Sequence, residues 1–204
     1  MLTATVYDLL SWHHCWPWIS EAILQTAGPQ ISWSALDVLG VEKVLPKDRL
    51  WIVLRPQLIP EKQLDELACQ FAEHVLPLFE TIFTLDSRPR AAIAAKREWI
   101  NGECSQSERD KAQEAARAAA WDADASARAA AAGAAWAASW AAVSAAEAAE
   151  GAAAWPTREV ATAACVAAAR AAWAAAREGE AFEAAAEEEA RWQVDVVRYT
   201  LIGM

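Results

Sequence analysis

A stripe of apolar residues between positions 60 and 82 constrains the fold more than any other feature of the chain. Its large apolar side chains recur at steps of three and four residues, at Leu64, Leu67, Phe71, Val75, Leu78 and Ile82. This spacing places them on one face of an α-helix, and charged residues such as Asp65 and Glu73 fall largely off that face. The stripe therefore predicts a helix that buries one side against the rest of the chain.

Pro77 lies inside this stripe, and a second helix is predicted soon after it. An interior proline removes a hydrogen bond and clashes with the carbonyl four residues back, so we expect a kink near His74, or a break with a quick restart. Asp86-Ser87 can cap the next helix, and Asn101-Gly102 is a typical helix end. Residues 60–102 are thus predicted to form a central helical hairpin.

The sequence before the hairpin, residues 1–58, predicts short helices separated by glycine and proline. They are expected at residues 6–14, 17–26, 32–39 and 46–55. Ser32 is predicted to cap the third helix. The fourth is expected to begin at Pro46 and to bury Leu50, Trp51, Val53 and Leu54. Strand-like composition occurs only near Val6 and in residues 194–201.

The sequence after the hairpin, residues 107–204, is rich in alanine with scattered tryptophans. Alanine loses no side-chain entropy in a helix, so this half predicts helices, the first beginning at Ser107. The last is expected over about residues 180–201, with one side formed by Phe182, Ala185, Trp192, Val196 and Tyr199. Residues 129–146 carry no charge, but spanning helices are richer in Leu, Ile, Val and Phe, so no membrane segment is expected.

Together these patterns predict an all-α fold, a single irregular helical bundle of about seven to nine helices. The alanine-rich C-terminal half is expected to pack closely, because alanine faces let helices approach one another while tryptophans fill the larger gaps. A chain of 204 residues is long enough for one domain and short for two. Residues 1–204 are therefore interpreted as one helical domain.

The charge balance and the cysteines narrow the class of protein. Lys and Arg number 18 against 28 Asp and Glu, and the net charge of -10 argues against nonspecific nucleic-acid binding. The same charge would suit a mimic of a polyanion. The four cysteines are widely spread without CxxC spacing, and the N-terminus lacks the pattern of a signal peptide. These features favour a reduced, cytoplasmic protein.

Motifs that carry catalytic or metal chemistry are missing from the sequence. It contains no GxGxxG, GxxxxGK[ST], GxSxG or HExxH pattern. His13-His14-Cys15 is the one local cluster of soft ligands, but neighbouring side chains on a helix point about 100° apart, so packing and capping roles are favoured over a metal site. The sequence therefore predicts a protein that is not an enzyme and needs no cofactor or metal.

Two groups of residues are candidates for binding a partner. Tryptophan and arginine are enriched in interface hot spots, and the N-terminal third brings several of them together, namely Trp12, Trp16, Trp18 and Trp33 with Arg49 and Arg55. The alternative for these tryptophans is core packing. Glu187 and Glu188 belong to an acidic run that could dock a basic partner, and the alternative is a solvated face.

Several segments also resemble a family of alanine-rich bacterial and phage proteins that are predicted to be immunity proteins of toxin systems. The resembling segments are Asp48-Arg49-Leu50-Trp51, residues 69–77, residues 86–90 and residues 189–193. Cys15-Trp16-Pro17 matches a further Cys-Pro element of the family, with Trp16 inserted. The resemblance implies an accessory protein of toxin loci or mobile elements that works by binding, and it brings no catalytic residues. Within it, Arg88 and Arg90 are the first positions to test, and the alternative is that they pair with Asp86 or with helix-end carbonyls.

The leading hypothesis is a stoichiometric inhibitor that binds and neutralises an antibacterial effector, either a cognate toxin or a host defence protein. A phage counter-defence protein, such as an anti-CRISPR, is one form of it. Because many effectors that act on nucleic acids are basic, an acidic inhibitor would be steered to them. The alternative is a sponge that sequesters a nucleotide-like ligand between tryptophans and arginines. An enzyme would instead require a pocket of converging polar residues with perturbed pKa values.

Overall fold

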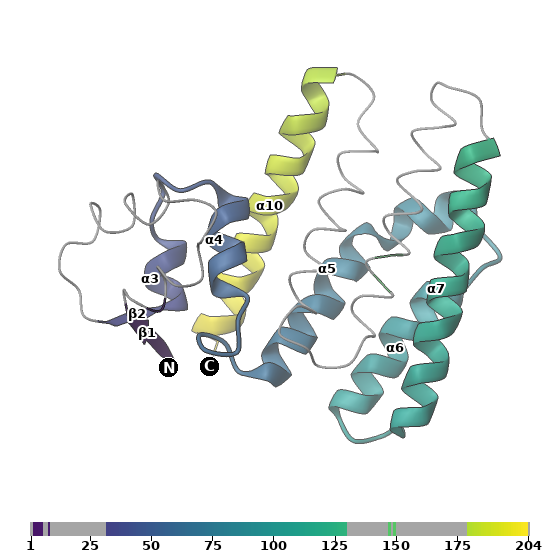
Figure 1. The fold of residues 1–204 in the computed structure, drawn as a ribbon, viewed down its shortest axis with the longest axis horizontal. Helices are drawn as coiled ribbons and strands as arrows, with labels where there is room; N and C mark the ends of the chain where they lie inside the picture. The colour runs from purple at the N-terminus through teal and green to yellow at the C-terminus, as the bar shows by residue number, and fades with distance from the viewer. Residues whose placement is uncertain are drawn as a thin grey trace. The chain divides into compact units, whose positions relative to one another are not determined.

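The computed structural model describes residues 2–5, 8, 32–129, 147, 149 and 179–203. Within these residues the protein is mainly helical, as predicted, with six helices and two short strands (Figure 1). The six described helices are fewer than the seven to nine predicted. The helices expected at residues 6–14 and 17–26, and those expected across residues 130–178, lie outside the described part. No helix in the described ranges is long and apolar enough to cross a membrane.

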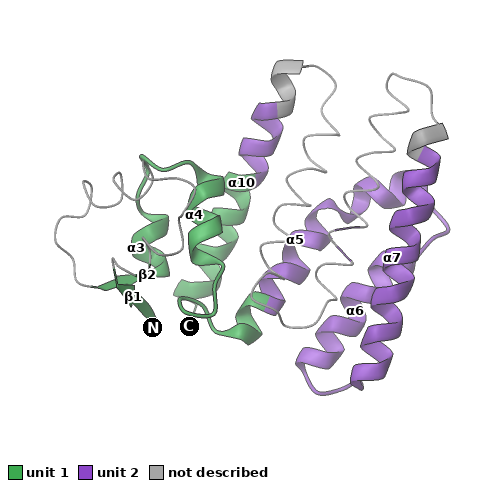
Figure 2. Ribbon diagram, in the orientation of Figure 1, with its two compact units in different colours: residues 1–64, 190–204 green, residues 65–189 purple. Residues whose placement is uncertain are grey.

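The chain divides into two compact units (Figure 2). Unit 1 consists of residues 1–64 and 190–204, and unit 2 consists of residues 65–189. Unit 1 is therefore assembled from two stretches that are distant in the sequence, whereas unit 2 is one continuous stretch.

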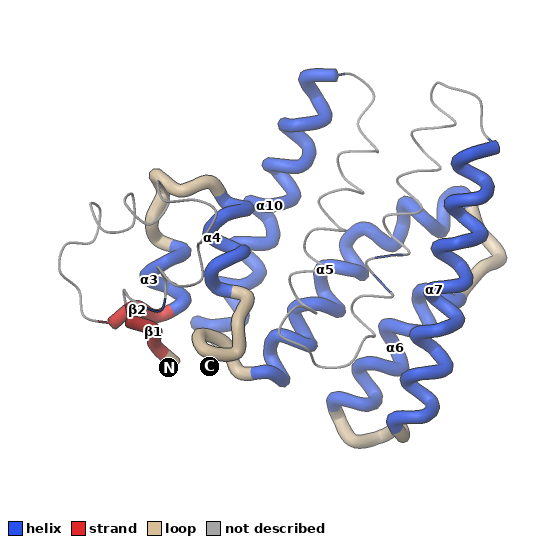
Figure 3. Tube along the Cα trace, viewed as in Figure 1, coloured by secondary structure: helices blue, strands red, loops and turns tan. Residues whose placement is uncertain are grey.

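Unit 1 contains a two-stranded antiparallel ribbon that the sequence did not lead us to expect. β1 (Thr3–Thr5) pairs with β2 (Ser32–Ser34), with Ala4 opposite Trp33 (Figure 3). Ser32 is consequently in a strand, and its predicted role as a helix cap is wrong. The cap of α3 (Ala35–Leu39) is Ser34, whose hydroxyl accepts from the Asp37 amide while the Asp37 carboxylate accepts from the Ser34 amide.

The helix α4 (Pro46–Val53) begins at its proline as predicted. It buries Leu50, Ile52 and Val53, but Trp51 is 38% exposed, so its predicted burial is wrong. The reason is angular. Consecutive helical residues are about 100° apart, which turns residue 51 away from the side that residues 46, 49, 50 and 53 share.

The helix α10 (Gly179–Ile202) confirms the predicted last helix, but its buried face differs from the expected one. The buried residues of its C-terminal half recur about every three to four positions, singly or as adjacent pairs, and they are Glu189, Ala190, Gln193, Val194, Val197 and Leu201. Tyr199, which the sequence groups with Phe182, Ala185, Trp192 and Val196 on one side of the helix, is exposed. Within unit 1, α10 is joined to α3 because the Arg198 guanidinium donates to the Leu39 carbonyl at 2.6 Å.

The helix α5 (Glu61–Ile82) is continuous through Pro77, so of the two predicted outcomes the break is wrong, and the kink near His74 stays a prediction. Pro77 lacks the N–H that would bond the Glu73 carbonyl, but the helix continues on both sides of this single gap. The apolar stripe is buried at Leu67, Phe71 and Val75 as predicted. The burial of the stripe ends before Ile82, which is exposed at the C-terminal end of the helix.

Two further helices complete the described part of unit 2. α6 (Arg88–Ile100) and α7 (Gln106–Ala129) lie side by side, and Ala92 of α6 packs with Ala116 and Ala112 of α7 (Figure 1). These methyl contacts are the close packing expected of alanine faces. The predicted start of α7 at Ser107 shifts slightly, because Ser105 forms the capping box with Glu108.

Candidate functional site

A groove of about 340 Å³ runs between α5 and α6 in unit 2. Its lining combines apolar residues of both helices with charged residues, and it consists of Glu73, Leu76, Arg90, Ile93, Ala94, Arg97, Glu98, Asn101 and Glu103. Leu76 and Ile93 are each 1% exposed and belong to the buried core. On α6, residues 90, 94, 97 and 101 fall on one helical face, since they are spaced three and four apart. The groove therefore has a small apolar base and a mostly charged and polar border.

Arg97 bridges the two helices across this groove. Its Nη1 donates to Glu73 at 2.5 Å and its Nη2 donates to Glu66 at 3.1 Å. Partial burial by itself lowers the pKa of Arg97, but the attraction of Glu66 and Glu73 outweighs it and raises the pKa overall. Arg97 thus stays charged and holds two carboxylates of α5 against α6.

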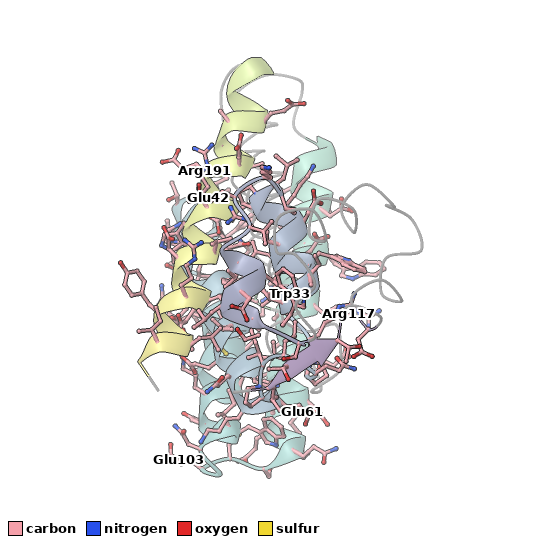
Figure 4. The ribbon with its side chains drawn as sticks, turned by 90° about the vertical axis from the view of Figure 1, so that its left-hand side faces the viewer. Trp33, Glu42, Glu61, Glu103, Arg117 and Arg191 are labelled. Carbon is pink, nitrogen blue, oxygen red and sulfur yellow. The ribbon has the colours of Figure 1, made fainter. Side chains whose placement is uncertain are left out.

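The end of α6 places two more carboxylates beside the groove. The Glu103 amide donates to the Glu98 carbonyl at 2.8 Å, and the Gly102 amide donates to the Trp99 carbonyl at 2.9 Å. This pair of bonds is a Schellman ending, and it requires Gly102 at φ 77°, a conformation that favours glycine. The turn returns the backbone of Glu103 to that of Glu98, and both side chains are exposed and line the groove; Glu103 is labelled in Figure 4.

Arg88 and Arg90, which the sequence singled out, both lie near the α5–α6 turn and both form ion pairs. Arg88 lies between Asp86, at 2.6 Å, and Asp122 of α7, at 2.7 Å. Arg90 binds Glu80 of α5 through two bonds of 2.6 and 2.7 Å. These hydrogen bonds raise the pKa of both arginines and lower the pKa of Asp86 and Glu80. The pairing of Arg88 with Asp86 was the predicted alternative, and Arg90 lines the groove.

A buried ion pair lies beneath this charged surface. Lys96, with its side chain fully buried, binds Asp65 at 2.9 Å. The Lys96 ammonium also lies 4.6 Å from the Trp99 ring centroid, and the Arg109 guanidinium lies 4.7 Å from the same centroid. Desolvation lowers the pKa of Lys96 despite the hydrogen bond to Asp65. Asp65 is therefore buried, although the sequence pattern placed it largely off the apolar face.

The other predicted binding residues belong to parts of the chain that do not line the groove. In unit 1, Arg49 is buried and donates to the Leu39 carbonyl at 2.5 Å, while the Arg55 guanidinium lies 4.1 Å from the Trp51 ring centroid. Glu187 and Glu188 are exposed on α10. Trp16 and Trp18 lie outside the described residues, as does His13-His14-Cys15.

The described residues offer no constellation for covalent or metal chemistry. Burial raises the pKa of the Cys69 thiol to about 12, so this thiol is inert at neutral pH. Cys104 donates weakly to the Ala95 carbonyl, and desolvation raises its pKa as well. Across the described ranges, no three His, Cys, Asp or Glu side chains are placed to hold a metal ion.

The sequence reasoning missed the groove residues Arg97, Glu98 and Glu103. One signal could have pointed to them, namely the spacing of residues 90, 94, 97 and 101 on one helical face followed by Asn101-Gly102. That pattern marks a charged face that ends in a reversing turn. Sequence alone does not show that α5 supplies an apolar strip opposite this face.

Comparison with known proteins supports one family. No curated protein and no solved structure matches the chain. A family model does match residues 57–146, a segment that contains α5, α6, α7 and the groove. The resemblance expected from the sequence is thereby confirmed for this segment: residues 57–146 are similar to the family described as "Imm-5 like putative immunity protein".

Proposed function

We propose that this protein is a cytoplasmic, non-enzymatic immunity protein that neutralises an antibacterial effector by binding it in a stoichiometric complex. The observation that carries the proposal is the family match over residues 57–146. An immunity function of this kind needs a binding surface and no catalytic group.

The structure of unit 2 supports a binding role. The matched segment contains a groove with an apolar floor and charged borders, a combination typical of protein interfaces. The chain carries a net charge of -10, which would accelerate encounter with a basic effector through electrostatic steering. The effector is therefore proposed to be a basic protein.

The proposal is tested by protection and by stoichiometry. Bacteria would carry an inducible gene for an effector encoded beside this gene, with or without this protein. We expect growth to be rescued only when this protein is present, and we expect light scattering on the co-purified pair to give a complex of fixed stoichiometry. Absence of rescue, or rescue at far less than one equivalent with a chemically altered effector, would contradict the proposal.

A second candidate, the nucleotide sponge, has one observation in its favour. Trp51 is 38% exposed, and Arg55 lies 4.1 Å from its ring centroid, so a base could stack at this place. However, no tryptophan lines the α5–α6 groove or the shallow groove along the start of α7. Denaturing the purified protein and searching the supernatant for an ultraviolet-absorbing nucleotide would decide between the two candidates.

A further inference from the structure

We infer that the groove between α5 and α6 is the surface that binds the effector, and that it receives a segment bearing arginine or lysine. The inference rests on the proposed function and names both the surface and the chemistry of the partner. It follows from the floor of the groove, from two carboxylates at its end and from the charge of its borders.

The floor of the groove suits the stem of a long basic side chain. Leu76 of α5 and Ile93 of α6 form the almost fully buried base, and the methyl group of exposed Ala94 supplies accessible apolar surface above them. Arginine and lysine side chains lay their methylene stems along such apolar surface and keep their charged ends in water. Because Ala94 is small, the groove stays open at this level.

The end of the groove suits the charged head of such a side chain. Glu98 and Glu103 are exposed and line the groove at the C-terminal end of α6. The backbone bonds of the Gly102 turn fix the segment that carries them. Among the described residues no side chain forms an ion pair with either carboxylate, so both can accept from an incoming guanidinium or ammonium group.

The arginines that line the groove do not oppose this reading, because they are already neutralised. Arg90 is bound by Glu80, and Arg97 is bound by Glu66 and Glu73. The three carboxylates in these pairs and the two of Glu98 and Glu103 make five negative charges in and around the groove. The two guanidinium groups are the positive charges, so the net charge is three negative units. Such a border attracts a cation and repels a phosphate or a nucleic acid.

The first arm of the test uses a hexa-arginine peptide as a probe that does not depend on the effector. In nitrogen-15 NMR titrations at physiological salt, we expect the largest shift changes at Ala94, Glu98, Asn101 and Glu103. A hexaglutamate peptide should cause none of them. Shift changes centred on the acidic residues of α10 instead, or no changes near the groove, would overturn the inference.

The second arm uses the effector and two charge-reversed variants. Glu98→Lys/Glu103→Lys should weaken effector binding by at least about 30-fold, because it puts two cations where a cation has to bind. The matched control is Glu42→Lys/Glu61→Lys, which makes the same charge change on exposed residues of unit 1 (Figure 4). It should change affinity by no more than about threefold, through steering alone. Equal losses in both variants would overturn the inference.

The outcomes separate this inference from the proposed function. If the wild-type protein protects cells and Glu98→Lys/Glu103→Lys protects equally well, the function stands and the groove is not the binding surface. If no effector is neutralised, the proposed immunity function is wrong. A basic effector as the occupant of the groove is then also wrong, even if the hexa-arginine peptide binds there. A concentration-dependent dimer that the same variant dissociates would assign the groove to a second copy of the chain and overturn the inference.

Discussion

In unit 1, Arg49 is buried and donates to the backbone carbonyl of Leu39, whereas in unit 2 Arg97 is 35% exposed and lies between two glutamates. Arg198 donates to the same Leu39 carbonyl, so unit 1 directs two arginines at one backbone oxygen. Unit 2 instead pairs Arg88, Arg90 and Arg97 with carboxylates of neighbouring elements. These arginines thus donate to a backbone carbonyl in unit 1 and organise a charged surface in unit 2.

The partner of each arginine distinguishes a structural arginine from one beside a binding surface. A buried guanidinium on a carbonyl can be removed only at a cost in stability, since its partner loses a hydrogen bond that water cannot readily replace in a dry environment. A surface guanidinium between carboxylates costs little to remove, because water replaces the lost bonds. Substitutions in the two units should therefore differ in their cost to stability.

The largest effect is expected at the buried pair of unit 2. Lys96→Ala leaves the Asp65 carboxylate buried without its ammonium partner, and should lower the free energy of unfolding by about 3–5 kcal/mol in urea denaturation. The double variant Asp65→Leu/Lys96→Met should recover most of the loss, because it removes both charges. Lys111→Ala, on an exposed residue of α7, is the control. Equal stability of the single and double variants would show that the pair is not the cause.

The next effect is expected at the buried arginine of unit 1. Arg49→Ala should lower the free energy of unfolding by about 1–3 kcal/mol, because the Leu39 carbonyl loses one of its two guanidinium donors. Arg97→Ala is the comparison in unit 2, where a loss of about 0–1 kcal/mol is expected. Both are measured by urea denaturation. An Arg97→Ala loss as large as that of Arg49→Ala would erase the distinction between the two units.

A smaller and equal effect is expected at one helix cap in each unit. Ser34→Ala removes the cap of α3, and Ser105→Ala removes that of α7, so each should cost about 1 kcal/mol of stability. Ser107→Ala, two residues into α7, should cost much less. If Ser107→Ala proves as costly as Ser105→Ala in thermal unfolding, the start of α7 lies later than the structure places it.

The smallest effect at neutral pH is expected from Arg90→Gln, which removes the partner of Glu80 at the surface. Arg90 lowers the pKa of Glu80 below its ordinary 4.5 in the folded protein. A carboxyl with a lowered folded pKa stabilises above its unfolded pKa, and the contribution is lost as pH falls through the folded value. Between about pH 5 and pH 3, Arg90→Gln should therefore lose less stability than the wild type. Parallel curves for the two proteins in acid would contradict the pairing.

The parts of the fold that depend on neighbouring residues were predictable. The helix over residues 61–82, the cap at Asp86-Ser87 and the end at Asn101-Gly102 follow from periodicity and from local turn chemistry. Ser87 makes no side-chain capping bond, but the Asp86 carboxylate accepts from the Arg88 amide at 3.0 Å. The predicted helix start was therefore correct, with Asp86 as the capping acceptor instead of Ser87.

The parts that depend on distant residues were not predictable from one sequence. Ser32 became a strand residue because β1 pairs with it, and β1 lies some thirty positions earlier in the chain. Asp65 faces the interior because Lys96 of another helix neutralises it there. The groove depends on α5 and α6 lying together, so no spacing within either helix reveals it.

The division of the chain between the units has a consequence for how the protein is made. During synthesis, all of unit 2 emerges before residues 190–204, which unit 1 needs for completion. Domains fold as units during translation. Residues 32–64 therefore lack the C-terminal part of α10 while unit 2 folds, and a chaperone can bind their apolar side chains during that interval. Protease digestion of arrested nascent chains should find unit 2 resistant at lengths where residues 32–64 are still cut, and simultaneous protection of both would contradict this order.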